Sequence, residues 1–411
     1  MKRFLYLLIT AFLLIPSINI IPADNEINNK FYVDDYVNGQ WDKTKEHPFR
    51  LIKNTMDTVT IQPVDIIIQL LMRLSKVPSI STCVIMNNTI IWSKGYGLYD
   101  IEHKKPATNE TLYNIASISK TVTATALMQL YEKSLFNLDD DINNYLSFQV
   151  RHPIYPDIPI TFRMLLSHLS GLSEDPEEFY KYFPPERCPI PLYPWIETYL
   201  SPIGNNYTDE IWSNDAPGEK FHYANIGFAL IGYLVETISG QPFYQYCKDN
   251  IFTPLKMYNT SYLLSFVNRS NLAIPYHFQI YKYIPYGHYC YIGYPCGSIH
   301  TSVTDFSHFI IAHMNQGVYD GYQLLNATTI QLMHTVQYPN EDYGLGWTIW
   351  NNTNNEHFYG HTGGDYGVAT SVTVRLSDNS AVIYFTNGEP LRPIQIKAWG
   401  LFENILFSNF T

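Results

Sequence analysis

A serine and a lysine three residues apart, Ser117 and Lys120, have the residue types for nucleophilic catalysis. If a helix begins here, this spacing puts both side chains on one helical face, so the ammonium can reach the serine Oγ. A serine hydroxyl needs a neighbouring base to become a nucleophile, and a helix N-terminus favours the negative charge of acyl transfer. About one such match is expected by chance at this composition. The pair alone is equally consistent with a solvated helix start.

Two further motifs downstream strengthen the hypothesis of a catalytic site. The triplet Tyr223-Ala224-Asn225 follows a Pro-Gly turn and enters an apolar run, Phe228 to Ile238, that is typical of a helix. The triplet His361-Thr362-Gly363, with Gly364 after it, forms a predicted turn before a strand with alternating apolar residues. The Tyr-x-Asn pattern also occurs elsewhere in the chain, so each motif is weak alone. Their order and local context together make a strong signal.

With these motifs, the chain resembles the superfamily of class C β-lactamases and D-Ala-D-Ala carboxypeptidases, which includes β-lactamase-fold esterases and D-amino-acid peptidases. The resemblance extends from about residue 64 to the C-terminus. The connecting segments that match are Gly95-Tyr96-Gly97, residues 160–172, residues 295–299 and residues 343–347. The resemblance implies a serine hydrolase with a β-lactamase/transpeptidase-like fold.

The resemblance also implies a role for each motif residue. Ser117 would attack a carbonyl and form an acyl-enzyme, with Tyr223 as proton shuttle and Lys120 holding it. The residues themselves leave the base open, because a phenolate or a neutral lysine could each accept the proton. Backbone N–H groups of Ser117 and Gly364 would stabilise the oxyanion, and Asn225 would bind Lys120 and the substrate amide. The predicted substrate-binding and oxyanion residues are Asn225, His361, Thr362, Gly363 and Gly364.

His361 occupies a position where class C β-lactamases have a lysine. Because histidine titrates near ~6.5, His361 would lack a fixed positive charge at neutral pH. We expect weaker attraction for a substrate carboxylate, and activity that changes near the histidine pKa. Peptidase or esterase activity is therefore favoured over true penicillinase activity. The alternative is a structural histidine that only forms hydrogen bonds.

The pattern of elements predicts the fold class α+β, with a central antiparallel sheet built from both chain ends, flanked by helices, and an inserted, mostly helical subdomain. Residues 1–23 are predicted to be a signal peptide, or alternatively an uncleaved anchor, and residues 24–63 an extension. Residues 64–411 would form the β-lactamase-related catalytic domain, with the helical insertion at about 134–300. Helices are expected at 64–74, 117–133 and 399–407, and strands at 81–91 and within 361–388.

Composition indicates the partners and the compartment. The net charge of −11 and the absence of a basic stripe argue against nucleic acid as a partner. Eight Asn-x-Ser/Thr sequons, against about four expected by chance, suggest a glycosylated protein that is secreted or in the endomembrane lumen. The expected partner is a small-molecule or peptide substrate, with no membrane contact beyond a signal anchor.

Cysteine and histidine positions suggest one disulfide and no metal. Cys83 and Cys247 lie in apolar runs typical of buried residues, whereas one bridge is expected among Cys188, Cys290 and Cys296. His357 and His361 have the spacing of helical zinc ligands, but their glycine-rich context predicts a turn into a strand. No metal or cofactor is therefore expected.

Two functions remain open. The first is a secreted serine hydrolase that acts through a Ser117 acyl-enzyme on peptide, amide or ester bonds. The second is a non-catalytic or filament-forming member of the same fold. The tyrosine-rich residues 276–294 are consistent either with the wall of a substrate cleft or with a packed surface loop.

Overall fold

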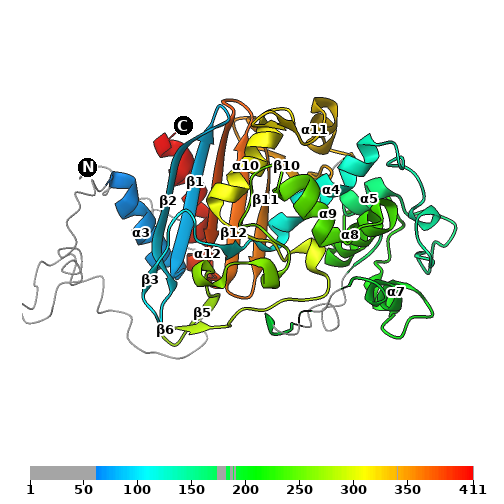
Figure 1. Cartoon of the computed structure of the whole chain (residues 1–411), viewed down its shortest axis with the longest axis horizontal. Coiled ribbons are helices and arrows are strands. Elements are labelled where there is room, and N and C mark those ends of the chain that lie inside the picture. Colours follow the sequence, from blue (N-terminus) through cyan, green and yellow to red (C-terminus); the bar gives the residue numbers. More distant parts are fainter. Residues whose placement is uncertain (1–61, 174–181, 186–187, 189–190, 340, 411) are drawn as a thin grey trace, which may run out of the picture. The chain divides into compact units, whose positions relative to one another are not determined.

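A computed structural model describes residues 62–173, 182–185, 188, 191–339 and 341–410 (Figure 1). The predicted signal peptide and nearly all of the predicted extension lie outside these residues. Within them, no helix combines the length and the apolar character needed to cross a membrane.

A seven-stranded antiparallel sheet forms the centre of the described chain, in the order β10-β11-β12-β13-β1-β2-β3. Strands from the two ends of the chain meet where β1 pairs with β13. The fold is therefore the predicted α+β, β-lactamase/transpeptidase-like fold. The strands are β1 (Ser79–Met86), β2 (Thr89–Asp100), β3 (Lys105–Pro106), β10 (Thr348–Asn351), β11 (His357–Asp365), β12 (Val368–Arg375) and β13 (Ser380–Thr386).

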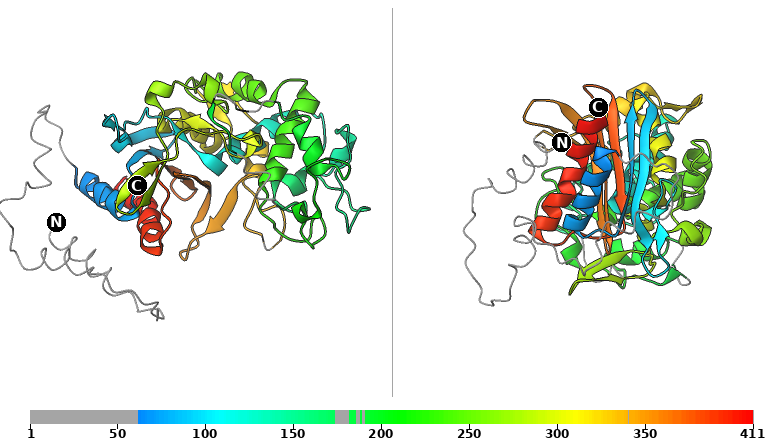
Figure 2. Two further views of the ribbon diagram at one scale, coloured as in Figure 1. Left: turned by 90° about the horizontal axis from the view of Figure 1, so that it is seen from below. Right: turned by 90° about the vertical axis from the view of Figure 1, so that its left-hand side faces the viewer.

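Helices cover both faces of the sheet. Because alternate residues of a strand point to opposite sides, β1 and β13 each contribute to two separate hydrophobic clusters. In β13, Val382 and Tyr384 pack with helices α3 (Pro63–Ser75) and α12 (Pro393–Phe410). Figure 2 shows α3 and α12 side by side against this face. The other face carries the larger core, which includes α4 (Ser119–Glu132) and α10 (Val303–Met314).

The region between α4 and α10 is mostly helix and loop, as expected, but it also contains strands that the sequence pattern did not predict. Its helices are α5 (Phe162–Leu166), α7 (Trp195–Leu200), α8 (Asn225–Ser239) and α9 (Phe243–Cys247), and α11 (Ala327–Met333) follows α10. Within this region, β5 (Tyr276–Gln279) pairs with β6 (Lys282–Pro285), and β7 (His300–Thr301) pairs with β4 (Tyr113–Asn114), which precedes α4. After α10, β8 (Val318–Tyr319) pairs with β9 (Tyr322–Gln323).

Three predicted elements differ in detail from the structure. The helix expected at 117–133 is a 3-10 turn, Ala116–Ile118, followed by α4. The His361 motif lies inside β11 rather than in a turn before a strand. The final helix, α12, is longer than the predicted 399–407. The glycines of the motif suggested a turn, but cross-strand hydrogen bonds to β12 hold them in the sheet.

The disulfide joins Cys188 to Cys290, which selects one of the pairings that the sequence left open. Cys83, Cys247 and Cys296 are buried and take no part in this disulfide. The bridge connects residues 102 positions apart in the chain. It therefore joins Cys188 to the tyrosine-rich stretch.

Candidate active site

Ser117 lies on a short, strained turn, Ala116–Ile118, that packs against β11 and β12. The preceding residue, Ala116, has φ +45°, a left-handed conformation that is costly for a residue with a Cβ. Its N–H donates to Asn114 Oδ1 at 2.7 Å, and the N–H of Ile115 donates to the carbonyl of Ile299 at 2.9 Å. These bonds hold the turn, so the strain is maintained by the surrounding structure.

Lys120 is fully buried at the start of α4, beneath Ser117. Its Nζ lies 3.1 Å from Ser117 Oγ, 2.5 Å from Asn225 Oδ1 and 2.9 Å from the carbonyl oxygen of Cys296. An ammonium has three protons to donate, and these three oxygens can accept all of them. The predicted contacts of Lys120 with Ser117 and Asn225 are therefore present in the structure.

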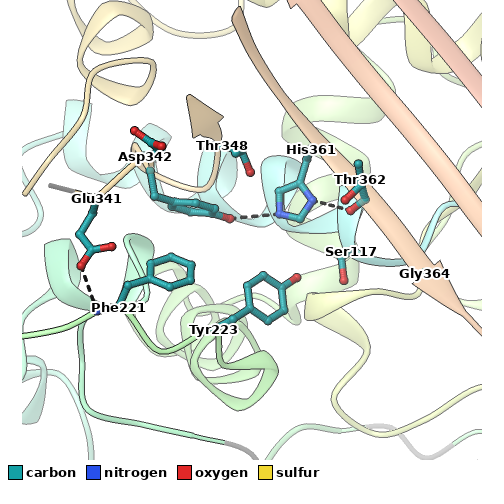
Figure 3. Close-up of a pocket in the computed structure, with 10 residues that line it drawn as sticks. Ser117, Phe221, Tyr223, Glu341, Asp342, Thr348, His361, Thr362 and Gly364 are labelled. Atoms are coloured by element: carbon teal, nitrogen blue, oxygen red, sulfur yellow. Dashed lines mark hydrogen bonds between the residues drawn. The ribbon is translucent and has the colours of Figure 1, made fainter. Parts of the chain in front are cut away.

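Tyr223 approaches the same pair from the other side. Its ring centroid lies 4.9 Å from Lys120 Nζ, within the range of a cation–π contact. Figure 3 shows the Tyr223 hydroxyl directed towards Ser117. The side chain is 40% exposed, so solvent and substrate can reach the phenol.

Gly363 brings β11 against the nucleophile turn. A Cβ at this position would lie 2.3 Å from the carbonyl oxygen of Ile115 and 2.3 Å from Thr370 Oγ1, so a larger residue would push the strand away. Thr370 Oγ1 also donates to that carbonyl at 2.9 Å, which ties β12 to the same turn. Gly364 then lies beside Ser117 on the pocket wall (Figure 3). This arrangement puts the two predicted oxyanion donors on adjoining elements.

His361 is buried and both of its ring nitrogens are occupied. Nδ1 lies 2.6 Å from the carbonyl of Thr362, which can only accept, so Nδ1 carries the proton. Nε2 then accepts from the hydroxyl of Tyr343 at 3.0 Å. Burial, with the nearby charge of Lys120, lowers the pKa of His361 to about 3. The expected titration near the ordinary histidine pKa was therefore wrong, because this site keeps the ring neutral.

An open pocket of about 570 Å³ collects most of the predicted site residues. Ser117, Tyr223, His361, Thr362 and Gly364 line it, with Lys120 and Asn225 bonded beneath Ser117. None of the tyrosine-rich residues 276–294 lines this pocket. The remaining lining residues are Phe221, Glu341, Asp342, Tyr343 and Thr348.

Sequence reasoning missed several residues of this site. Tyr343 lies in a segment that matched the superfamily, but only the fold shows that its hydroxyl bonds His361. Glu341 and Asp342 add two carboxylates to the pocket wall, and no spacing pattern indicated them. Conversely, His357 and His361 are four residues apart on a strand, about 13 Å, so they cannot share a metal ion.

The comparison with known proteins agrees with this geometry. The model of the family described as Beta-lactamase matches residues 64–401. The chain belongs to this family. Membership supports a function of the serine-hydrolase type, as does the Ser117–Lys120 contact.

Relatives within the family are distant in sequence. Protein flp of Staphylococcus aureus (strain MW2) is 24% identical over 79% of this chain, and the chain spans 63% of the length of that relative. Penicillin-binding protein 4* of Bacillus subtilis (strain 168) is 23% identical over 77% of this chain and 70% of its own length.

Solved structures show the same fold. The octameric penicillin-binding protein homologue from Pyrococcus abyssi has a TM-score of 0.65 at 25% identity and covers 82% of this chain and 76% of its own. The penicillin-binding protein from Bacillus halodurans has a TM-score of 0.64 at 22% identity and covers 84% of this chain and 100% of its own.

Proposed function

We propose that this protein is a secreted serine hydrolase that cleaves a peptide, amide or ester bond through a Ser117 acyl-enzyme. The observation that carries the proposal is the buried Lys120 Nζ at 3.1 Å from Ser117 Oγ, within an open pocket. A lysine is expensive to bury, and this one is retained with its nitrogen against a serine hydroxyl. Secretion is supported by the apolar N-terminal segment and the sequons.

The proposed reaction has two acyl-transfer steps. Tyr223, as a phenolate stabilised by the ammonium of Lys120, accepts the proton of Ser117 while Oγ bonds to the substrate carbonyl carbon. The N–H groups of Ser117 and Gly364 hold the oxyanion. The bond to the leaving group then breaks, and Tyr223 returns the proton to it. In the second step water loses a proton to Tyr223 and attacks the ester carbon. The bond from that carbon to Ser117 Oγ then breaks, Tyr223 returns the proton to Oγ, and the acid is released.

The charges of the pocket disfavour an anionic substrate such as a penicillin. His361 is neutral, and the ammonium of Lys120 is occupied by three oxygens. Glu341 and Asp342 on the pocket wall would repel a carboxylate. We therefore propose a neutral or amine-bearing small molecule or peptide as the substrate, with peptidase or esterase activity preferred to β-lactamase activity.

Labelling with a fluorophosphonate probe tests the proposal. We expect the wild type to gain one adduct by intact mass, Ser117→Ala to gain none, and Ser408→Ala, a matched change at an exposed serine of α12, to behave as the wild type. Turnover of p-nitrophenyl acetate should follow the same order. If the wild type shows neither labelling nor turnover, nor acylation by a fluorescent penicillin, the non-catalytic alternative replaces the hydrolase.

A further inference from the structure

His168 lies beside the candidate base although no sequence motif marked it as a site residue. It follows helix α5 and its C-cap, Ser167, and it has φ +59°, in the left-handed region. Only 1% of its surface is exposed. A buried histidine in a strained backbone conformation is costly, so its contacts show what it stabilises.

The contacts of His168 enclose Tyr223 from both sides along the chain. The carbonyl oxygen of His168 accepts from the N–H of His222 at 2.8 Å. Its Nδ1 accepts from the N–H of Ala224 at 3.1 Å. Between these two bonds, the imidazole packs on the Tyr223 ring with centroids 4.4 Å apart. The residues before and after Tyr223, and its ring, are thus all held by one residue.

The hydrogen bonding of His168 indicates more than packing. Because Nδ1 accepts a hydrogen bond, the neutral ring carries its proton on Nε2. That buried Nε2 has no hydrogen-bond partner among the described residues. Burial, and then the charge of Lys120, lower the pKa of His168 well below its usual value, so protonation does not supply a charge here. An apolar side chain would avoid the unsatisfied donor, but it would also lose the acceptor for Ala224.

We propose that His168 is a positioning residue that holds the Tyr223 phenol in register with Ser117. This inference rests on the proposed function, because it takes Tyr223 as the proton shuttle. His168 does not line the pocket; it acts through the backbone on both sides of Tyr223 and through contact with the Tyr223 ring. The same loop leads directly into Asn225, the first residue of α8 and a partner of Lys120, so the register of both residues depends on it.

Three substitutions of His168 distinguish the contribution of its hydrogen-bond acceptor, Nδ1, from that of its aromatic ring. His168→Asn keeps an acceptor near the position of Nδ1 and tolerates positive φ. His168→Phe keeps an aromatic ring but leaves the N–H of Ala224 without a partner, and His168→Gln moves the amide away from it. His313→Gln is the matched control, because His313 is a buried histidine of α10 that also has a lowered pKa.

The rate constant of fluorophosphonate labelling and kcat for p-nitrophenyl acetate are measured for each full-length variant. We expect His168→Phe and His168→Gln to react ~10- to 100-fold more slowly with KM nearly unchanged, and His168→Asn to remain within a factor of about five of the wild type. His313→Gln should lower the melting temperature without changing either rate.

Each result supports or overturns the proposal. The proposal is overturned if His168→Phe and His168→Gln both react at wild-type rates. It is also overturned if His168→Asn loses as much rate as those two variants, because the residue would then have a structural role alone. If His168→Phe does not fold, the comparison of Asn with Gln decides. No labelling of the wild type rejects the proposed function, and the positioning role with it, whereas labelling that is insensitive to His168 rejects the positioning role only.

Discussion

The described chain contains two pairs of neighbouring histidines whose hydrogen bonds are completed differently. In the core pair, His313 and His334, the nitrogens His313 Nδ1 and His334 Nε2 lie 3.2 Å apart. His313 Nε2 lies 3.2 Å from Thr125 Oγ1, which itself donates to the carbonyl of Thr121 and must therefore accept here. His334 Nε2–H therefore donates to His313 Nδ1, and His313 Nε2–H donates to Thr125 Oγ1. The ring of His313 packs against Trp347, and the ring of His334 stacks on Tyr359.

The site pair, His168 and His361, both contact Tyr343. His361 uses both nitrogens, whereas Nε2 of His168 has no partner in the described chain. All four histidines have a lowered pKa, with burial as the main cause. A lowered histidine pKa is therefore not sufficient evidence of a catalytic role in this protein. The site pair is distinguished by Lys120, Ser117 and the open pocket beside it.

The largest expected contrast between the pairs comes from their neighbouring tyrosines. We expect Tyr223→Phe to lower kcat for p-nitrophenyl acetate by ~10²–10⁴-fold with little change in KM, because the proton shuttle is lost. Tyr359→Phe is the matched control, since Tyr359 stacks on His334 at 3.7 Å and lies outside the pocket lining. Equal kcat in the two variants would show that Tyr223 is not the base and would move that role to Lys120.

A smaller effect should follow from giving His361 a charge. His361→Lys restores the cation found at this position in class C β-lactamases, so acylation by a fluorescent penicillin should rise ~10-fold through attraction of its carboxylate. Turnover of a neutral ester should change much less. His361→Gln, which is uncharged, serves as the control. If penicillin acylation stays as slow in His361→Lys as in His361→Gln, charge at this position does not govern substrate choice.

The smallest expected effect is on acid stability, to which both pairs contribute. Burial lowers the pKa of both His313 and His361 to about 3 in the folded chain, whereas the unfolded residues take up protons near ~6.5. Their stability contribution is therefore complete above pH ~6.5 and is lost as the pH falls towards 3. Asp365 opposes this partly, because burial raises its pKa to about 6 and the folded state binds that proton first.

Melting temperatures at pH 7.5 and 4.5 measure this effect. We expect the wild type to melt at a lower temperature at pH 4.5. His313→Met should be less stable at pH 7.5 by about 1–3 kcal/mol but should lose less on acidification, since one buried site that resists protonation is gone. If the melting temperature of His313→Met falls between pH 7.5 and 4.5 by as much as that of the wild type, the core pair does not contribute to acid sensitivity.

Local patterns allowed much of the fold to be predicted. The strands predicted at 81–91 and within 361–388 are present as β1 with the start of β2, and as β11, β12 and β13. Asn87 and Asn88 both have positive φ in the turn between β1 and β2, as an asparagine pair allows. The glycines after His361 misled the prediction, because glycine suggests a turn wherever the close approach of another segment is unknown. Position 363 must be glycine because a Cβ there would collide with the carbonyl oxygen of Ile115, which is nearly 250 residues earlier in the chain.

By itself the sequence determined which groups can react and their order: a serine and a lysine on one helical face, a tyrosine before a helix, and a histidine in place of a lysine. Only the tertiary structure decided their chemical state. Lys120 contacts Asn225 and Cys296, which are 105 and 176 positions away. Burial, with the charge of Lys120, lowers the pKa of His361 and keeps the ring neutral. The ring of His168 packs on that of Tyr223, which is 55 positions later in the chain. Protonation and position depend on such distant neighbours, because burial and hydrogen-bond partners arise only when the chain folds.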